Sequence, residues 1–526
     1  MSRGLGNGTL QGQSSKVTTM LLRIVPLLLA ASVGIVVLDA GFVYDDPSAL
    51  LENPLVNGEA PAWEAFVRDF WGRPASHGFT SWRPVMPMIW ALLWKLWPGN
   101  PLPFHILSTL LHVLAVAMSM RFVYGLRPSL SWAAAVGTLF ALHPLNTESV
   151  SAIVAQADLL SFSLALGACT IALKPPSLRA GALCASVLLL ATLVKESTVI
   201  FAPLAALLFL IQPGAKRLRW LAALPVAVMT GCVVGLQLSL PRAPGVAMIA
   251  NNLAHQAHGE VRLLLGLYNI GRSLVMTVWP WPIAPNHGYA AVELEAEVLA
   301  PYAAAGALLL IVGVIAGVWA LGRRRAEWVA ALSFLYAPAL LQSHWFVPLI
   351  TDLAERLLYP SILGIAMTAI IGIFGWVERP AIRKVVVASL AVAFFVSSLS
   401  ARRAWTDEDS LWIYAVRVEP RAARHHRNVS NTFFRAGDLD RGAYHRFIDT
   451  YLVNRFPEAV QWEEIESTRS LSPLQRFVEL PEILEPEDPC PLIRIFVGKA
   501  REYAPLYEHV IEHWGPRYPH CVPQTP

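Results

Sequence analysis

The chain has 526 residues, of which 55% are hydrophobic and only 15% are charged, and its mean hydropathy is +0.48. Soluble globular domains carry roughly 25% charged residues, so this composition excludes that class and indicates an integral membrane protein. The formal net charge of +4 is too small to indicate a nucleic-acid partner.

Apolar stretches recur from Leu21 to Leu399, each long enough to cross a hydrocarbon core of about 30 Å. They predict an all-α polytopic bundle of about 11 transmembrane helices, at residues 21–40, 102–122, 130–143, 148–173, 180–194, 197–213, 219–240, 299–321, 327–348, 357–376 and 382–400. Basic residues occupy alternate short connections, which the positive-inside rule places in the cytoplasm. An odd number of crossings puts the C-terminal tail outside, so we expect a multi-pass inner (plasma) membrane protein with a periplasmic or otherwise extracytoplasmic tail.

The stretch 260–282 is also apolar, but another crossing there would put Arg323–Arg325 on the wrong side. We therefore expect a re-entrant or interfacial helix, or half of an unresolved pair. The composition turns polar at Arg402, which predicts a transmembrane domain at 1–401 and a small helical soluble domain at 402–526. In that tail Cys490 and Cys521 can pair if the tail is outside the cytoplasm.

Asp45 and Asp46 are adjacent carboxylates at the outer end of the first predicted span. The carbonyl end of a helix and nearby lipid both disfavour their charged forms, so one of the pair is a candidate general base. The alternative is a solvated helix terminus followed by an Asp46-Pro47 turn. Because the other unusual polar residues are predicted on the same side, we favour the functional interpretation.

The first outer loop carries an aromatic face at helical spacing, from Trp63 to Trp71, which predicts juxtamembrane helices. Packing is the preferred role for these rings, and Asp69 is a weak pocket candidate. Arg83 opens the next apolar helix, and its planar guanidinium suits a phosphate. The alternative for Arg83 is a surface pair with Asp69.

Four further ionisable residues are pocket candidates on the same side. Glu148 begins the span 148–173, and Asp158 is expected about three turns inside it, where it either pairs with a basic residue or lines a cavity. Lys195 and Glu196 follow the fifth span and are expected to form an internal ion pair or to join the pocket.

Glu355 and Arg356 enter the tenth span from outside, and Tyr359 follows Arg356 by three residues. On a continuous helix Arg356 and Tyr359 share one face, where a cation and a phenol can both donate to a phosphate oxygen. The alternative is an arginine that snorkels to lipid headgroups. We expect Glu355 to line the same pocket.

His143, with its neighbour Pro144, is also placed at the outer pocket. Together with His105 and His112 it could imitate a metal site. Helical histidines that hydrogen-bond within a core are commoner, so no metal site and no cofactor are predicted, and a divalent-metal requirement is left open.

In order and spacing, these segments resemble the transmembrane and tetratricopeptide-repeat O-mannosyltransferases and their bacterial relatives, within the GT-C glycosyltransferase superfamily. The similarity runs through Phe42–Asp46, Asn53-Pro54, Asp69–Gly72, Trp82–Pro84, Phe104-His105, Leu111-His112, Phe140–Pro144, Thr147–Val150, Ala157–Leu160, Lys195–Ser197 and Glu355–Ser361. It departs at Gln156 and Ser108, where the family often has Arg and Asn. Residues 421–526 contain at most one or two helix pairs instead of a long repeat array.

The resemblance implies a GT-C fold, a polyprenyl- or dolichyl-phosphate-linked sugar donor, commonly mannose, and transfer to a hydroxyl on the extracytoplasmic face. The acceptor class stays open among protein, glycan and lipid. By position, a carboxylate of the Asp45-Asp46 pair would deprotonate the acceptor, and Arg356, with Arg83, would hold the phosphate. No Gly-rich nucleotide loop occurs, which agrees with a lipid-linked donor.

Two other functions are compatible with the composition. A proton-coupled transporter or lipid flippase would use Asp158 and the outer carboxylates as a proton relay, but such proteins place ionisable groups near the midplane and show related halves. The ionisable groups here crowd one predicted face, and no internal repeat is visible. The third function is a catalytically silent scaffold that presents the tail to partners.

Overall fold

The computed structural model describes residues 6–241, 252, 254, 257–281, 283–285, 287, 296–347, 349, 351–420, 422–438, 441, 442, 445, 446, 449, 490, 497, 512 and 516–521. Within these residues the regular structure is helical, and the only extended pairing is one bridge between Arg68 and Pro74. Most of the predicted soluble domain at 402–526 lies outside the described residues.

Eight of the described helices are long and apolar enough to cross a membrane. They are α1 (Gly6–Ile35), α4 (Leu102–Leu126), α7 (Gln156–Ile171) with the turn η4 (Ile153–Ala155), α10 (Lys216–Ser239), α12 (Gly259–Val278), α13 (Ala296–Gly322), α15 (Tyr359–Trp376) with the turn η7 (Glu355–Leu358), and α16 (Pro380–Ala404). Shorter apolar helices are α3 (Val85–Leu96), α5 (Leu130–Leu142), α8 (Leu178–Val194), α9 (Ala202–Ile211) with the turn η5 (Glu196–Phe201), and α14 (Ala326–Leu341).

Each of the eleven predicted spans overlaps one of these helices, but one span begins later than expected. Residues 148–173 comprise the end of α6 (Asn146–Ser151), then η4 and α7. Asp158 therefore lies in the first turn of α7 and not three turns inside a span. The segment breaks because the helical hydrogen-bonding pattern is interrupted at Ala152, whose backbone is extended.

Most of the apolar stretch 260–282 belongs to one continuous helix, α12 (Gly259–Val278), which packs against α13. A side chain at Gly306 would meet the backbone of Leu267 and Gly271, so the absence of a Cβ there lets the two helices approach closely. The length and hydropathy of α12 also permit a crossing. The interfacial orientation of α12 therefore stays a prediction.

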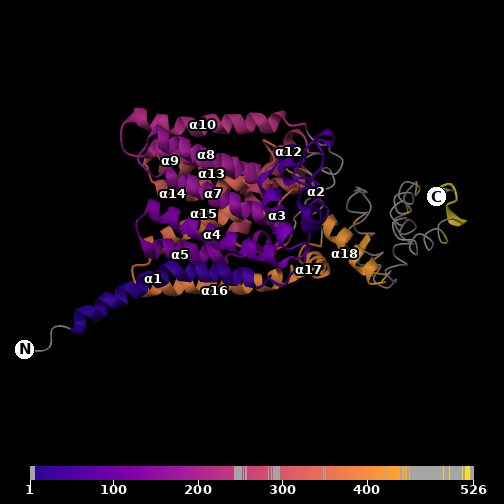
Figure 1. Cartoon of the computed structure of the whole chain (residues 1–526), viewed down its shortest axis with the longest axis horizontal. Helices are drawn as coiled ribbons and strands as arrows, with labels where there is room; N and C mark the ends of the chain where they lie inside the picture. Colours follow the sequence, from indigo (N-terminus) through magenta and orange to yellow (C-terminus); the bar gives the residue numbers. More distant parts are fainter. Residues whose placement is uncertain are drawn as a thin grey trace, which may run out of the picture.

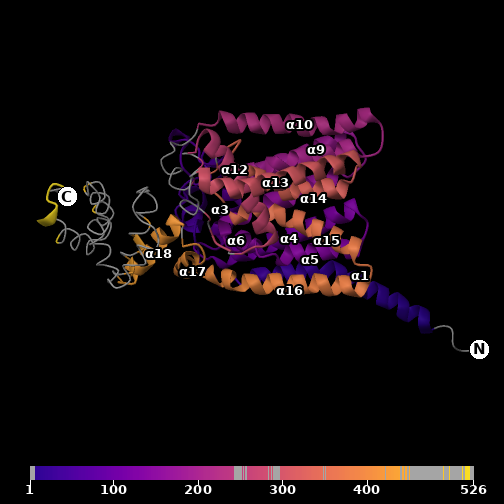
Figure 2. The same ribbon diagram turned by 180° about the vertical axis from the view of Figure 1, so that it is seen from behind.

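The helices lie side by side along the long axis of the molecule, and the short helix α2 and the helices α17 and α18 gather at the end away from the N-terminus (Figures 1 and 2). We call this the site end. It contains α2 (Pro54–Asn57), α17 (Glu408–Val418) and α18 (Ala423–Arg435). The first predicted outer loop carries short helices as expected, although the stretch from Trp63 to Trp71 is not one helix, because the turn η2 (Ala62–Phe66) ends before the bridge at Arg68.

Candidate active site

The turn that follows α1 places Tyr44 in a strained backbone conformation at the site end. Its φ is 68°, a region that residues with a Cβ rarely adopt. The Tyr44 N–H donates to Glu408 Oε2 at 2.8 Å, and the ring packs between Trp405 and Trp412, with centroids 5.8 and 5.6 Å away. Residues held in such conformations by their surroundings cluster at functional sites, so this turn is a candidate site on geometry alone.

The two adjacent aspartates lie in different surroundings. Asp46 is fully buried and accepts backbone N–H groups from Val43 at 3.3 Å, Ile153 at 3.2 Å and Val154 at 2.8 Å. Burial raises the pKa of Asp46 to about 7 against these three donors. These hydrogen bonds join the turn to η4, and which of the two aspartates serves as the base stays a prediction. Asp45 keeps 22% of its side chain exposed.

Asp45 and Arg356 belong to one cluster around Tyr44. The Arg356 guanidinium carbon lies 5.9 Å from the centre of the Tyr44 ring, and that of Arg424 lies 4.6 Å from it. Arg424 Nη2 donates to Asp45 Oδ1 at 3.0 Å. Arg356 in turn donates to Glu148 from its backbone N–H at 2.9 Å and from its guanidinium. The chain thus brings two carboxylates and two guanidinium groups together, and three of these four residues, Asp45, Glu148 and Arg356, were expected to lie close together.

The Tyr44 hydroxyl is buried, and no hydrogen-bond partner for it occurs among the described residues. Burial raises the pKa of Tyr44, so its phenol stays protonated and can act as a hydrogen-bond donor. A buried polar atom without a partner is costly in a finished core. Here the hydroxyl belongs to a ring that two guanidinium groups approach, which suits it to donate to an anionic ligand.

Arg83 is engaged by Glu196 and not by Asp69. The guanidinium makes two parallel hydrogen bonds to the Glu196 carboxylate, at 2.7 and 2.8 Å, and lies over the Phe70 ring at 5.0 Å. Asp69 instead accepts N–H groups of its own loop. The prediction of a Lys195–Glu196 pair is also wrong, because the extended backbone at Lys195 separates the two side chains.

Lys195 pairs with Asp158, at 2.5 Å between Nζ and Oδ1, and 5% and 9% of the two side chains are exposed. Both alternatives for Asp158 hold, because this ion pair also borders a pocket. The pocket is lined by Asp158, Ser161, Phe162, Lys195, Ser197, Thr198, Ile200, Phe201, Leu341, Leu357 and Pro360. Gln156, where the sequence departs from the expected pattern, accepts from Trp90 and donates to Ser108.

Tyr359 and His143 do not join the cluster. The Tyr359 side chain is fully buried, its hydroxyl lies 2.8 Å from His112 Nδ1, and its ring packs on Phe140. The predicted shared face is lost because Arg356 lies in the turn η7, whereas α15 begins at Tyr359. His143 is the C-cap residue that follows α5, and its Nε2 contacts the Thr277 carbonyl at 3.1 Å.

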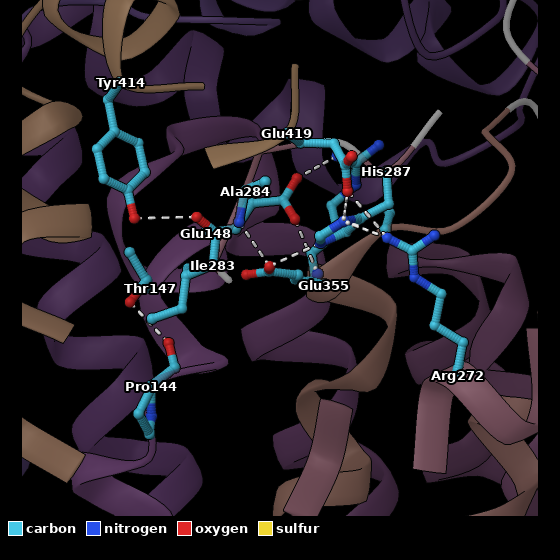
Figure 3. A network of polar contacts seen from close by, with 12 residues as sticks. Pro144, Thr147, Glu148, Arg272, Ile283, Ala284, His287, Glu355, Tyr414 and Glu419 are labelled. Atoms are coloured by element: carbon cyan, nitrogen blue, oxygen red, sulfur yellow. Dashed lines mark hydrogen bonds and ion pairs between the residues drawn. The ribbon is translucent and has the colours of Figure 1, made fainter. Parts of the chain in front are cut away.

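Glu355 joins three segments at the site end and does not line the pocket described above. It accepts the Ala284 N–H at 2.7 Å and contacts His287 Nε2 at 2.9 Å (Figure 3). Arg272 donates to Glu419 at 3.0 Å and contacts His287 Nδ1 at 3.1 Å. The network therefore fixes η7, the residues after α12 and the end of α17 to one another, beside Glu148.

Sequence reasoning missed Arg424 and the hydroxyl of Tyr44. Tyr44 was visible in the Tyr44-Asp45-Asp46 motif, but Arg424 lies in the polar tail and shows no signal of its own. The disulfide between Cys490 and Cys521 is present, with the Cα atoms 4.7 Å apart. His520 approaches both sulfur atoms, and that is the one three-residue group with metal-ligating spacing in the described part of the chain.

Comparison with known proteins adds homology over part of the chain. The chain is 42% identical to Drosophila melanogaster protein O-mannosyl-transferase Tmtc2 over 127 residues, which are 23% of this chain and 13% of the relative. It is 31% identical to D. melanogaster protein O-mannosyl-transferase Tmtc1 over 286 residues, 49% of this chain and 33% of the relative. It is 32% identical to Caenorhabditis elegans protein O-mannosyl-transferase F38B6.6 over 205 residues, which are 38% of this chain and 28% of the relative.

The chain thus spans at most a third of the length of these relatives. No protein-family model and no solved structure matches it. The described helices and these similarities together identify a multi-pass membrane protein that is distantly homologous to protein O-mannosyl-transferases.

Proposed function

We propose that this protein is a GT-C glycosyltransferase that moves a hexose, with mannose as the proposed sugar, from a polyprenyl-phosphate donor to a hydroxyl group. The acceptor is a protein, a glycan or a lipid, and the site end faces the extracytoplasmic side. The convergence of Asp45 and Arg356 on Tyr44 carries the proposal. The homology to protein O-mannosyl-transferases supports it.

In the proposed reaction Asp45 accepts the proton of the acceptor hydroxyl. The acceptor oxygen forms a bond to the anomeric carbon while the bond from that carbon to the phosphate oxygen breaks. The lipid phosphate leaves with the bonding electron pair and gains a negative charge, which the Arg356 guanidinium and the Tyr44 hydroxyl stabilise. One displacement of this kind inverts the anomeric configuration, and Asp45 then releases its proton to solvent.

The pocket beside the Asp158–Lys195 pair suits the lipid part of the donor. Most of its wall is apolar, and Leu357 and Pro360 join it directly to the segment that carries Arg356. We assign the first isoprene units to this wall, with the phosphate at Arg356. Arg83 contributes positive potential near the pocket; Glu196 binds one edge of its guanidinium, through Nε and Nη2, and the proposed phosphate contact falls to Nη1.

The test uses the full chain in lipid nanodiscs with radiolabelled polyprenyl-phosphate mannose and with protein, glycan and lipid acceptors in separate reactions. Covalent incorporation of label supports the proposal. In sealed vesicles, accumulation of unchanged donor without incorporation would instead identify a transporter or flippase.

Asp45→Asn should abolish transfer while the protein stays folded and donor binding stays at the wild-type value, because asparagine removes the base and keeps the shape. Asp409→Asn is the matched control, since Asp409 is an exposed carboxylate on α17 whose side chain is 53% exposed. Full turnover in Asp45→Asn would remove the assigned base. Arg356→Ala should weaken binding of farnesyl phosphate more than binding of the acceptor, and equal phosphate affinity would contradict its role.

A further inference from the structure

Arg424 reaches the site from outside the transmembrane bundle. It belongs to α18, the second helix after α16, and lies 379 residues from Asp45 in the sequence. Its guanidinium donates to Asp45 at 3.0 Å and covers the Tyr44 ring at 4.6 Å. With 25% and 22% of the two side chains exposed, the ion pair lies at the mouth of the cluster and not on an open surface.

Buried contacts fix the position of α18. His425 Nδ1 contacts the Glu419 carbonyl at 3.0 Å, and His426 Nε2 contacts the Pro420 carbonyl at 2.7 Å, where α18 begins. Glu419 itself accepts from Arg272. Both histidines are buried, and through Glu419 and its partly buried ion pair with Arg272 the start of α18 is joined to α12. The guanidinium of Arg424 is therefore presented from a rigid element.

A carboxylate and a guanidinium that serve one displacement must not neutralise each other. Asp45 and Arg356 are near enough to interact electrostatically, and a direct ion pair between them would occupy both the base and the phosphate ligand. Each group instead has another partner that leaves part of it available: Arg424 engages Oδ1 of Asp45 and leaves Oδ2, and Glu148 engages Nη1 of Arg356 and leaves the other guanidinium nitrogens. These two partners keep the base and the cation apart around the Tyr44 ring.

We propose that Arg424 is a positioning residue for Asp45, and that α18 of the C-terminal tail is thereby a working part of the transfer site. The inference rests on the proposed function, in which Asp45 is the base. The guanidinium orients the carboxylate toward the acceptor and prevents its collapse onto Arg356. It touches neither the reacting carbon nor the leaving phosphate.

The test compares Arg424→Ala, Arg424→Gln and Arg424→Lys with Arg435→Ala in the full chain in nanodiscs. Arg435 is the matched control, because it lies on the same helix and pairs with Asp409, with 56% of its side chain exposed. Arg424→Ala should lower kcat by about 10- to 100-fold, the cost of a misplaced catalytic group, with the donor KM within about twofold of wild type. Arg424→Lys should recover part of kcat, and Arg435→Ala should behave as wild type.

Hydrogen exchange of residues 41–53 gives a readout that needs no turnover. Loss of the guanidinium should speed exchange there in Arg424→Ala and Arg424→Gln, and not in Arg435→Ala. Unchanged exchange, or unchanged kcat with a raised donor KM, overturns the inference. If the wild type transfers no sugar, the proposed function fails, and hydrogen exchange still decides whether Arg424 holds the Asp45 turn. If Arg424→Ala does not fold, Arg424→Gln and Arg424→Lys carry the comparison.

Discussion

Glu148 holds Arg356 at two points, although 208 residues separate them in the sequence. Glu148 Oε2 accepts the Arg356 backbone N–H at 2.9 Å, and Oε1 accepts from the guanidinium. Only 2% of the Glu148 side chain and 17% of the Arg356 side chain are exposed. The carboxylate therefore sets both the start of η7 and the direction of the guanidinium.

Glu148→Ala should weaken binding of farnesyl phosphate and lower the free energy of unfolding by about 3 kcal/mol, because it leaves a largely buried cation unpaired. Titration calorimetry and thermal denaturation in detergent measure the two effects. Glu64→Ala is the control, since Glu64 pairs with Arg68 in a more exposed helical turn and should cost less than about 1 kcal/mol. Equal losses in the two variants would contradict a special role for Glu148.

Asp46 should make stability depend on pH. Burial raises its pKa from 3.8 to about 7, so between these values the folded state binds a proton that the unfolded state does not. The contribution of Asp46 to stability therefore grows as the pH falls from 7 toward 4 and declines as the pH rises. Melting temperatures of the wild type and of Asp46→Asn over this pH range measure the contribution of Asp46. If melting temperature depends on pH in the same way in both proteins, Asp46 does not have a raised pKa in the folded state.

Asp46→Ala should be more damaging than Asp46→Asn. The alanine variant leaves the N–H groups of Val43, Ile153 and Val154 without their acceptor, whereas asparagine retains one acceptor oxygen. A buried unsatisfied group costs about 1–3 kcal/mol, so the loss should be several kcal/mol. Denaturant titration at pH 7 gives the comparison. Asp46→Ala with wild-type stability would show that the turn does not depend on this carboxylate.

Sequence patterns located the helices well, because apolar runs of membrane length are a strong signal and each predicted span overlaps a helix. They also predicted that Asp45 and Arg356 lie at the same end of the bundle, because basic residues occupy alternate connections and mark the opposite side of the membrane. The prediction for Tyr359 was wrong for a local reason: it extended helical periodicity across residues 355–361, where the chain changes from η7 to α15.

The features that the sequence did not resolve have a different physical origin. Sequence alone does not distinguish two adjacent carboxylates, because the role of Asp46 depends on backbone N–H groups more than 100 residues away. Lys195 and Glu196 are neighbours whose partners, Asp158 and Arg83, come from other segments. The contact of Arg424 with Asp45 depends on how the tail packs against the bundle, and no local sequence pattern predicts that packing.

The buried pair of Asp158 and Lys195 should show strong coupling in a double-mutant cycle. Lys195→Met alone leaves a carboxylate unpaired in a largely apolar pocket and should cost about 3–5 kcal/mol, and Asp158→Leu alone should cost a similar amount. The double variant should recover most of the loss, because burying two charges carries its own desolvation cost. Additive losses in unfolding measurements would argue against a direct interaction.

The disulfide between Cys490 and Cys521 tests the proposal that the C-terminal tail lies on the extracytoplasmic side of the membrane. Bonds of this kind persist in oxidising compartments, so an extracytoplasmic tail should be isolated with Cys490 and Cys521 joined. Alkylation without reductant, followed by peptide mass spectrometry, should modify neither of them. Alkylation after reduction, which frees both thiols, is the control for reagent access. Ready alkylation of Cys490 and Cys521 in freshly isolated membranes would place the tail in a reducing compartment.

His287 should give the contact between the tail and the bundle a pH dependence of its own. Burial opposes its charged form, but hydrogen bonds to Glu355 and Glu419 outweigh burial and raise the pKa of His287, with the charged Arg272 opposing them. A raised pKa means that the stabilisation is complete below the ordinary value of 6.5 and is lost as the pH rises beyond it. Wild-type melting temperature should therefore fall as the pH rises above 6.5.

His287→Gln should flatten that decline, since glutamine keeps a hydrogen-bonding side chain and cannot titrate. The pH range separates the effect of His287, which lies above pH 6.5, from the effect of Asp46, which acts mainly below pH 7. Hydrogen exchange of residues 408–420 should rise with pH in the wild type and stay constant in His287→Gln, because Glu419 loses a charged partner only in the former. An identical rise in both proteins would show that the tail is held by packing and not by this histidine.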